Sequence, residues 1–169
     1  MTRNTRSQPV AVIIGATSKW QSDGRNTKLA HGKALDDSNI PVGMRWGVGG
    51  ALAQKFAKEG FFTVLTTRTA SNAAALEAAI KQQGNACMTV ELDLSSEKSI
   101  ASAFATIRAE AGEPEVLIYN AGYLEGRDLP PGQELLEYIP VEMFDTAHHI
   151  ASRGPFLDRK STRLNSSHT

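Results

Sequence analysis

The chain lacks several features, and each absence narrows what it can do. Among its 169 residues there is one cysteine, Cys87, so neither an intramolecular disulfide nor a cysteine-rich zinc site can form. Its 18 Lys and Arg residues balance 18 Asp and Glu residues, which leaves no net positive field for a nucleic-acid backbone. No apolar run approaches the ~18 residues of a membrane-spanning helix. We therefore expect one cytoplasmic domain that binds neither nucleic acid nor a membrane.

What the chain does contain is an alternation of strand-like and helix-like segments. Apolar runs of strand length occupy residues 10–15, 62–65, 88–92 and 116–119. This alternation without hairpin signals predicts an α/β fold, a doubly wound parallel sheet that extends to a fourth strand and a following helix. The expected helices run from Gly47 to Gly60, from a cap at Ser71 to about Gly84, from a cap at Ser95 or Ser96 to about Gly112, and from Val141 to about Ser152.

A long insertion separates the first expected strand from the first expected helix. Residues 19–46 show no apolar periodicity, and they contain five basic and three acidic residues. Two interpretations stay open, a flap over a bound phosphate and a passive surface loop.

Residues suited to ligand binding follow the expected strands. In an open parallel sheet, ligands bind beyond the carboxyl ends of the strands, where Gly15, Arg68, Asp93 and Asn120 stand. Glycines let the backbone approach a pyrophosphate, and the N-terminus of the following helix offers N–H groups to it. By themselves these glycines are equally consistent with a purely conformational role.

Taken in order, five segments resemble the first half of the short-chain dehydrogenase/reductase family. They read IIGATS, GVGGALA, TTR, LDLSS and IYNAG, and the resemblance covers roughly residues 10–157. The NAG segment after the fourth strand is the most diagnostic part. The resemblance implies a Rossmann-type sheet, a nicotinamide dinucleotide, and hydride transfer to or from a small carbonyl or alcohol substrate.

The resemblance also assigns roles to individual residues. It places a glycine motif and a phosphate turn after the first strand, an adenine-contacting pair after the third, and a segment that supports the sheet and borders the cofactor ribose after the fourth. A solvated carboxylate ahead of a helix and a satisfied turn amide are the alternatives for Asp93 and Asn120. The cofactor-binding residues so assigned are Gly15, Thr17, Ser18, Gly47, Val48, Gly49, Arg68, Asp93, Leu94, Asn120, Ala121 and Gly122.

Arg68 bears on the choice of cofactor. A carboxylate at the end of the second strand suits a 2′-hydroxyl, whereas a 2′-phosphate favours a guanidinium group. Thr67 stands where NAD-preferring relatives have Asp, and Arg68 follows it. This pattern predicts a preference for NADP(H) over NAD(H), with a solvated Arg as the alternative.

Three departures from the family pattern bear on activity. The pattern places three residues between its first two glycines, whereas 31 separate Gly15 from Gly47. Ala151 stands at the position of a catalytic Asn, in the stretch IASRGPF. No tyrosine of the chain has Lys four residues later, and the family's catalytic Ser has no counterpart here. We therefore predict a cofactor-binding fragment that lacks the catalytic Ser, Tyr and Lys.

The last residues differ in character from the rest. Residues 158–169, DRKSTRLNSSHT, are polar and lack helical apolar spacing, so we interpret them as a non-native tail outside the fold and residues 1–157 as one partial domain. His148 and His149 are adjacent and cannot share a metal from one helix face, so no metal site is predicted. A non-catalytic nucleotide sensor or scaffold is the alternative function, and a homo-oligomer stays open.

Overall fold

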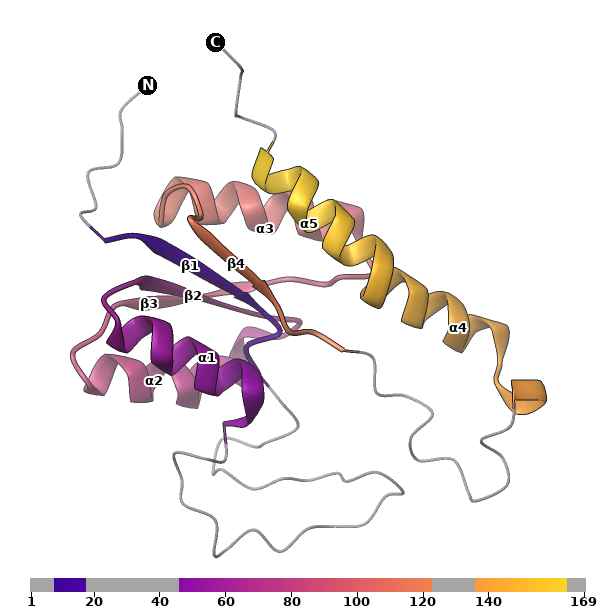
Figure 1. Ribbon diagram of the computed structural model, residues 1–169, viewed down its shortest axis with the longest axis horizontal. Coiled ribbons are helices and arrows are strands. Elements are labelled where there is room, and N and C mark those ends of the chain that lie inside the picture. Colours follow the sequence, from indigo (N-terminus) through magenta and orange to yellow (C-terminus); the bar gives the residue numbers. More distant parts are fainter. Residues whose placement is uncertain (1–7, 18–45, 123–135, 164–169) are drawn as a thin grey trace, which may run out of the picture.

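The computed structural model describes residues 8–17, 46–122 and 136–163 (Figure 1). Its sheet has four parallel strands in the order β3-β2-β1-β4. This arrangement confirms the predicted doubly wound α/β fold, and each strand lies within two residues of its expected position. The strands are β1 (Val10–Ile14), β2 (Phe62–Thr67), β3 (Cys87–Glu91) and β4 (Val116–Tyr119).

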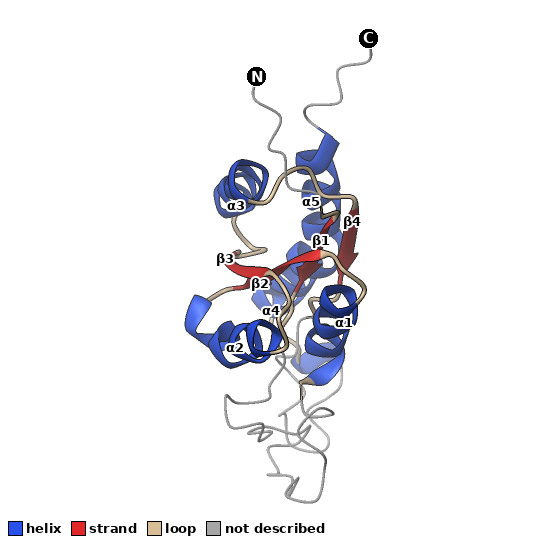
Figure 2. Cartoon of the chain, turned by 90° about the vertical axis from the view of Figure 1, so that its left-hand side faces the viewer, coloured by secondary structure: helices blue, strands red, loops and turns tan. Residues whose placement is uncertain are grey.

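Helices cover both faces of the sheet (Figure 2). α1 and α2 lie on one face, and α3 and α5 lie on the other. Among the described residues, no helix is both long and apolar enough to cross a bilayer. The helical elements are α1 (Gly47–Lys58), η3 (Ala70–Ala73), α2 (Ala74–Gln82), α3 (Glu97–Glu110), η4 (Leu136–Tyr138), α4 (Val141–His148), η5 (His149–Arg153) and α5 (Gly154–Arg163).

The position of β1 inside the sheet explains why its sequence is apolar and does not alternate with polar residues. All five residues of β1 are buried, because helices pack on both faces of the sheet. Val12 and Ile14 belong to the core on the α3 side, whereas Ile13 belongs to the core on the α1 side. Burial of such side chains contributes roughly 1.5–3 kcal/mol each.

Two expected helix caps have different outcomes. The side chain of Ser96 accepts the backbone N–H of Ser99 at 3.2 Å, which confirms a cap at the start of α3. The cap expected at Ser71 is wrong, because Ser71 lies inside the 3-10 turn η3 and α2 begins only at Ala74. A carboxylate from β3, Glu91, accepts the backbone N–H of Ala70 at 2.9 Å and fixes this turn from outside.

The C-terminal helix is longer than the sequence pattern suggested. α4, the π-helical turn η5 and α5 follow one another without a break, so the expected end at about Ser152 is wrong. The exclusion of residues 158–163 from the fold is also wrong, since Asp158 and Ser161 are buried and α5 packs against α3. Arg108 of α3 donates to the carbonyl of Ser161 at 2.8 Å. This tertiary contact overrides the polar local sequence, while residues 164–169 lie outside the described residues.

Candidate functional site

The turn after β1 can be formed only by glycine at its first position. Gly15 has a φ of +77°, in the left-handed region that other residues disfavour. A Cβ at Gly15 would lie 2.8 Å from the backbone N of Ala121. The ends of β1 and β4 therefore approach each other at backbone distance.

The first turn of α1 approaches the same place. A Cβ at Gly49 would lie 2.3 Å from the carbonyl oxygen of Gly15 and 2.7 Å from Nδ2 of Asn120. Gly49 is buried, whereas the neighbouring Val48 is exposed and Gly47 has a φ of +67°. Gly15 and the segment Gly47–Gly49 are distant in sequence, yet their backbones lie side by side. We call this arrangement the glycine cradle.

Asn120 joins the end of β4 to this cradle. Its Nδ2 donates to the carbonyl of Gly15 at 3.0 Å, and its backbone N–H donates to the carbonyl of Ile14 at 2.9 Å. The alternative of a satisfied turn amide therefore describes its present contacts well. The Asn120 side chain thereby holds the turn after β1 in place.

Threonines of β2 hold the turn from the other side, and sequence reasoning missed one of them. The Thr66 hydroxyl accepts the N–H of Gly15 at 3.3 Å and donates to the carbonyl of Ile13 at 3.1 Å. The hydroxyls of Thr17 and Thr67 lie 3.0 Å apart. The available signal was a pair of threonines ending an otherwise apolar strand.

Arg68 and Asp93 follow neighbouring strands and share an electrostatic environment. Arg68 is exposed directly after β2, and Asp93 is half-buried after β3. Hydrogen bonds from the hydroxyl and N–H of Ser95 lower the pKa of Asp93, and the charge of Arg68 lowers it further against the opposing effect of burial. The Asp93 carboxylate is therefore ionised at neutral pH. Its hydrogen bonds to Ser95, just ahead of α3, are consistent with the alternative of a partly solvated residue before a helix.

The remaining predicted residues are less closely grouped. Leu94 packs against the core on the α3 side. Gly122 is exposed, and a Cβ added there would meet no atom of the described residues within 4 Å. Ser18 lies outside the described residues. The structure therefore brings the first glycines, Thr17, Asn120 and Ala121 together. Arg68 follows Thr67 at the same end of the sheet, and its charge acts on Asp93.

Ala151, which stands where the family pattern has a catalytic Asn, lies in the π-helical turn η5. Ala151 is exposed within the π-helical turn η5, and the Tyr119 hydroxyl donates to the carbonyl of Ile150 in that turn. Burial, followed by the charge of Asp158, raises the pKa of Tyr119. Tyr119 is therefore a neutral donor that anchors η5 to the end of β4, a contact that residue spacing alone does not predict.

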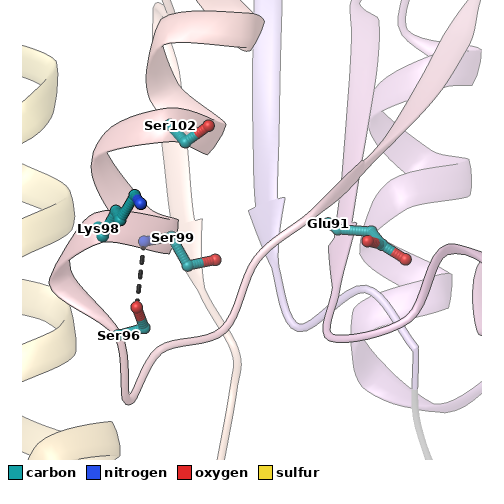
Figure 3. A pocket seen from close by; sticks show the side chains of 5 residues that line it. All are labelled: Glu91, Ser96, Lys98, Ser99 and Ser102. Carbon is teal, nitrogen blue, oxygen red and sulfur yellow. Dashed lines mark hydrogen bonds between the residues drawn. The ribbon is translucent and has the colours of Figure 1, made fainter.

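A pocket lies beside this edge of the sheet, between β3 and α3 (Figure 3). Its volume is about 400 Å³. Ser99 connects it to the predicted site, because its hydroxyl accepts the backbone N–H of Asp93 at 3.0 Å. The lining residues are Glu91, Ser96, Lys98, Ser99 and Ser102.

Comparison with known proteins places this geometry in a family. The family model described as enoyl-(acyl carrier protein) reductase matches residues 42–163, which is most of the chain. The chain belongs to the short-chain dehydrogenase/reductase family. This result confirms the resemblance predicted from the ordered motifs.

Individual relatives in the short-chain dehydrogenase/reductase family are distant and longer. An uncharacterized oxidoreductase of Bacillus subtilis is 28% identical over 129 residues, covering 76% of this chain and 45% of the relative. A 3β-hydroxysteroid dehydrogenase of Mediterraneibacter gnavus is 32% identical over 83 residues, covering 49% of this chain and 30% of the relative. The chain thus spans half or less of the length of these curated relatives.

Solved structures of the family share the fold. A metagenomic short-chain oxidoreductase in complex with NADP gives a TM-score of 0.65 at 24% identity, covering 90% of this chain and 54% of its own. Actinorhodin polyketide ketoreductase with NADPH gives a TM-score of 0.69 at 19% identity, covering 95% of this chain and 48% of its own. At these identities the likeness establishes the fold.

Proposed function

We propose that the chain is the nucleotide-binding portion of a nicotinamide-dependent oxidoreductase. The whole protein would move hydride between the cofactor and a small carbonyl or alcohol substrate. The observation that carries this proposal is the glycine cradle, where a Cβ on Gly49 would lie 2.3 Å from the carbonyl oxygen of Gly15. A site in which two backbone segments come this close suits a pyrophosphate, which needs access to backbone N–H groups.

The start of α1 supports the same assignment. Its first turn contains no acidic residue, and Trp46 provides no side-chain cap within the described part of the chain. The first N–H groups of a helix need partners, and its positive dipole end favours an anion. In this proposal the first turn of α1 binds the pyrophosphate, while Asn120 keeps the turn after β1 in position.

Arg68 would select the phosphorylated cofactor, NADP(H). It is exposed directly after β2, where Thr67 contributes no carboxylate against a 2′-phosphate. Two of the solved relatives described above carry NADP or NADPH, which supports a nicotinamide dinucleotide as the ligand class.

Substitution of Arg68 tests this selection. Arg68→Ala is expected to weaken NADPH binding about 10- to 100-fold, the range of a lost charge-assisted hydrogen bond, and to leave NADH binding unchanged. Calorimetric titration of both cofactors measures the two affinities. Lys58→Ala, at an exposed position in the last turn of α1, removes the same charge away from the site and serves as the matched control. Equal affinities of the unsubstituted chain for the two cofactors would contradict a role for Arg68.

The 169-residue chain is expected to bind cofactor without turning it over. None of its tyrosines has Lys four residues later, so a general acid of the family's kind is missing from the sequence. NADPH absorbance followed with a panel of aldehydes and ketones should match a buffer control. Steady NADPH consumption that scales with protein concentration would overturn this expectation.

A further inference from the structure

Glu91 of β3 reaches the turn in which Arg68 stands. It pairs with Thr67 in the register between β2 and β3, so the two residues are neighbours across the sheet. Its Oε1 accepts the backbone N–H of Ala70 at 2.9 Å. A carboxylate is thus present at the turn after β2, although the sequence of β2 itself supplies none.

The carboxylate of Glu91 is hydrogen-bonded to the turn after β2 and is directed away from the α3 side of the neighbouring pocket. Glu91 is one of the residues that line the pocket, but in Figure 3 its carboxylate points away from Ser96, Lys98 and Ser99. It is exposed, so its charge acts on any group that approaches the turn from solvent. Strand register, and not sequence proximity, brings it there.

From this geometry we infer that Glu91 is a specificity-determining residue that opposes the 2′-phosphate of NADP(H). A 2′-phosphate bound by Arg68 would meet a carboxylate of like charge, and the N–H of Ala70, a donor it could use, is already occupied. A 2′-hydroxyl carries no charge and meets no such repulsion. Arg68 and Glu91 therefore act in opposite directions, and their balance sets the ratio of NADPH to NADH affinity.

The role of Glu91 rests on the proposed function, because it requires a nicotinamide dinucleotide at this edge. Asp93 also faces Arg68 electrostatically, but its carboxylate is engaged by Ser95. The Glu91 carboxylate is bound instead to the turn itself. A change at Glu91 should consequently alter 2′-phosphate recognition more than a change of charge elsewhere on the surface.

Glu91→Gln tests the inference, since the amide keeps the shape and can still accept the Ala70 N–H while losing the charge. We expect NADPH affinity to rise about two- to fivefold, the range for exposed charge pairs, with NADH affinity unchanged. Calorimetric titration of the full chain with both cofactors gives the ratio. Glu110→Gln, exposed at the end of α3, is the matched control and should leave the ratio unchanged.

The outcomes separate the two proposals. If both cofactors bind and Glu91→Gln leaves their affinity ratio unchanged, the role of Glu91 is overturned while the proposed function stands. If the unsubstituted chain has a folded circular dichroism spectrum and binds neither NADPH nor NADH, the proposed function fails and the role of Glu91 fails with it. A raised ratio that disappears at high salt supports the inference, because exposed charges are screened.

Discussion

Gly49→Ala is expected to abolish nicotinamide-dinucleotide binding and to destabilise the fold by about 3 kcal/mol, at the upper end of the usual cost of overpacking. The added methyl would lie 2.3 Å from the carbonyl oxygen of Gly15 and 2.7 Å from Nδ2 of Asn120. These two atoms are hydrogen-bonded to each other, so neither can move away without breaking that bond. The first turn of α1 must therefore move outward from the cradle.

Chemical denaturation and calorimetry measure the two effects of Gly49→Ala separately. Gly122→Ala is the control for stability, because a Cβ at Gly122 meets no atom within 4 Å among the described residues. Its unfolding midpoint should equal that of the unsubstituted chain. If Gly49→Ala retained both the unfolding midpoint and the cofactor affinity, the close approach of α1 to the turn after β1 would be refuted.

A second large effect is expected at Asp158 in α5. Its side chain is fully buried, and neither carboxylate oxygen has a hydrogen-bond partner within the described residues. Burial raises the pKa of Asp158 from its ordinary 3.8 to about 7. Between these two values the folded state holds a proton that the unfolded state releases, so stability falls as the pH rises from about 4 to about 7 and stays low above that range.

Asp158→Leu should therefore stabilise the chain more at about pH 8 than at about pH 5. We expect a gain of about 1–3 kcal/mol at the higher pH, the usual cost of a buried polar group without a partner. Denaturant unfolding at both pH values measures the difference. Asp145→Leu, at an exposed position of α4, removes a carboxylate without that burial and should show no such pH dependence. The same gain at both pH values would contradict ionisation of Asp158 as the cause.

The local sequence pattern was sufficient to predict those elements that do not depend on contacts with residues distant in the sequence. The apolar run of β1 reflects burial on both faces, and Ser96 caps α3 through a residue three positions away. Ser71 shows the limit, because the start of α2 depends on a hydrogen bond between Ala70 and Glu91 on another strand. Likewise, α5 continues past Leu157 because it packs on α3, whatever the polarity of its own sequence.

The candidate site likewise contains residues that could be identified from the sequence and residues that could not. Gly15 and Asn120 could be identified because their residue types and order are characteristic of one family. The contacts of Thr66 with the turn after β1 could not, since they depend on how β2 aligns with β1. Glu91 belongs to the same class, because its place beside Thr67 follows from strand register alone. Residues that act across strands carry no local signal of their role.

The contact between Gly15 and Gly49 also has a consequence for how the chain folds. The family pattern places three residues between the first two glycines, whereas here 31 lie between Gly15 and Gly47. Loop-closure entropy grows by about 0.6 kcal/mol for each doubling of length, so closing this loop costs roughly 2 kcal/mol more than closing the family's short one. The docking of α1 on β1 thus joins residues that lie far apart in the sequence, and contacts of this kind slow folding relative to local ones.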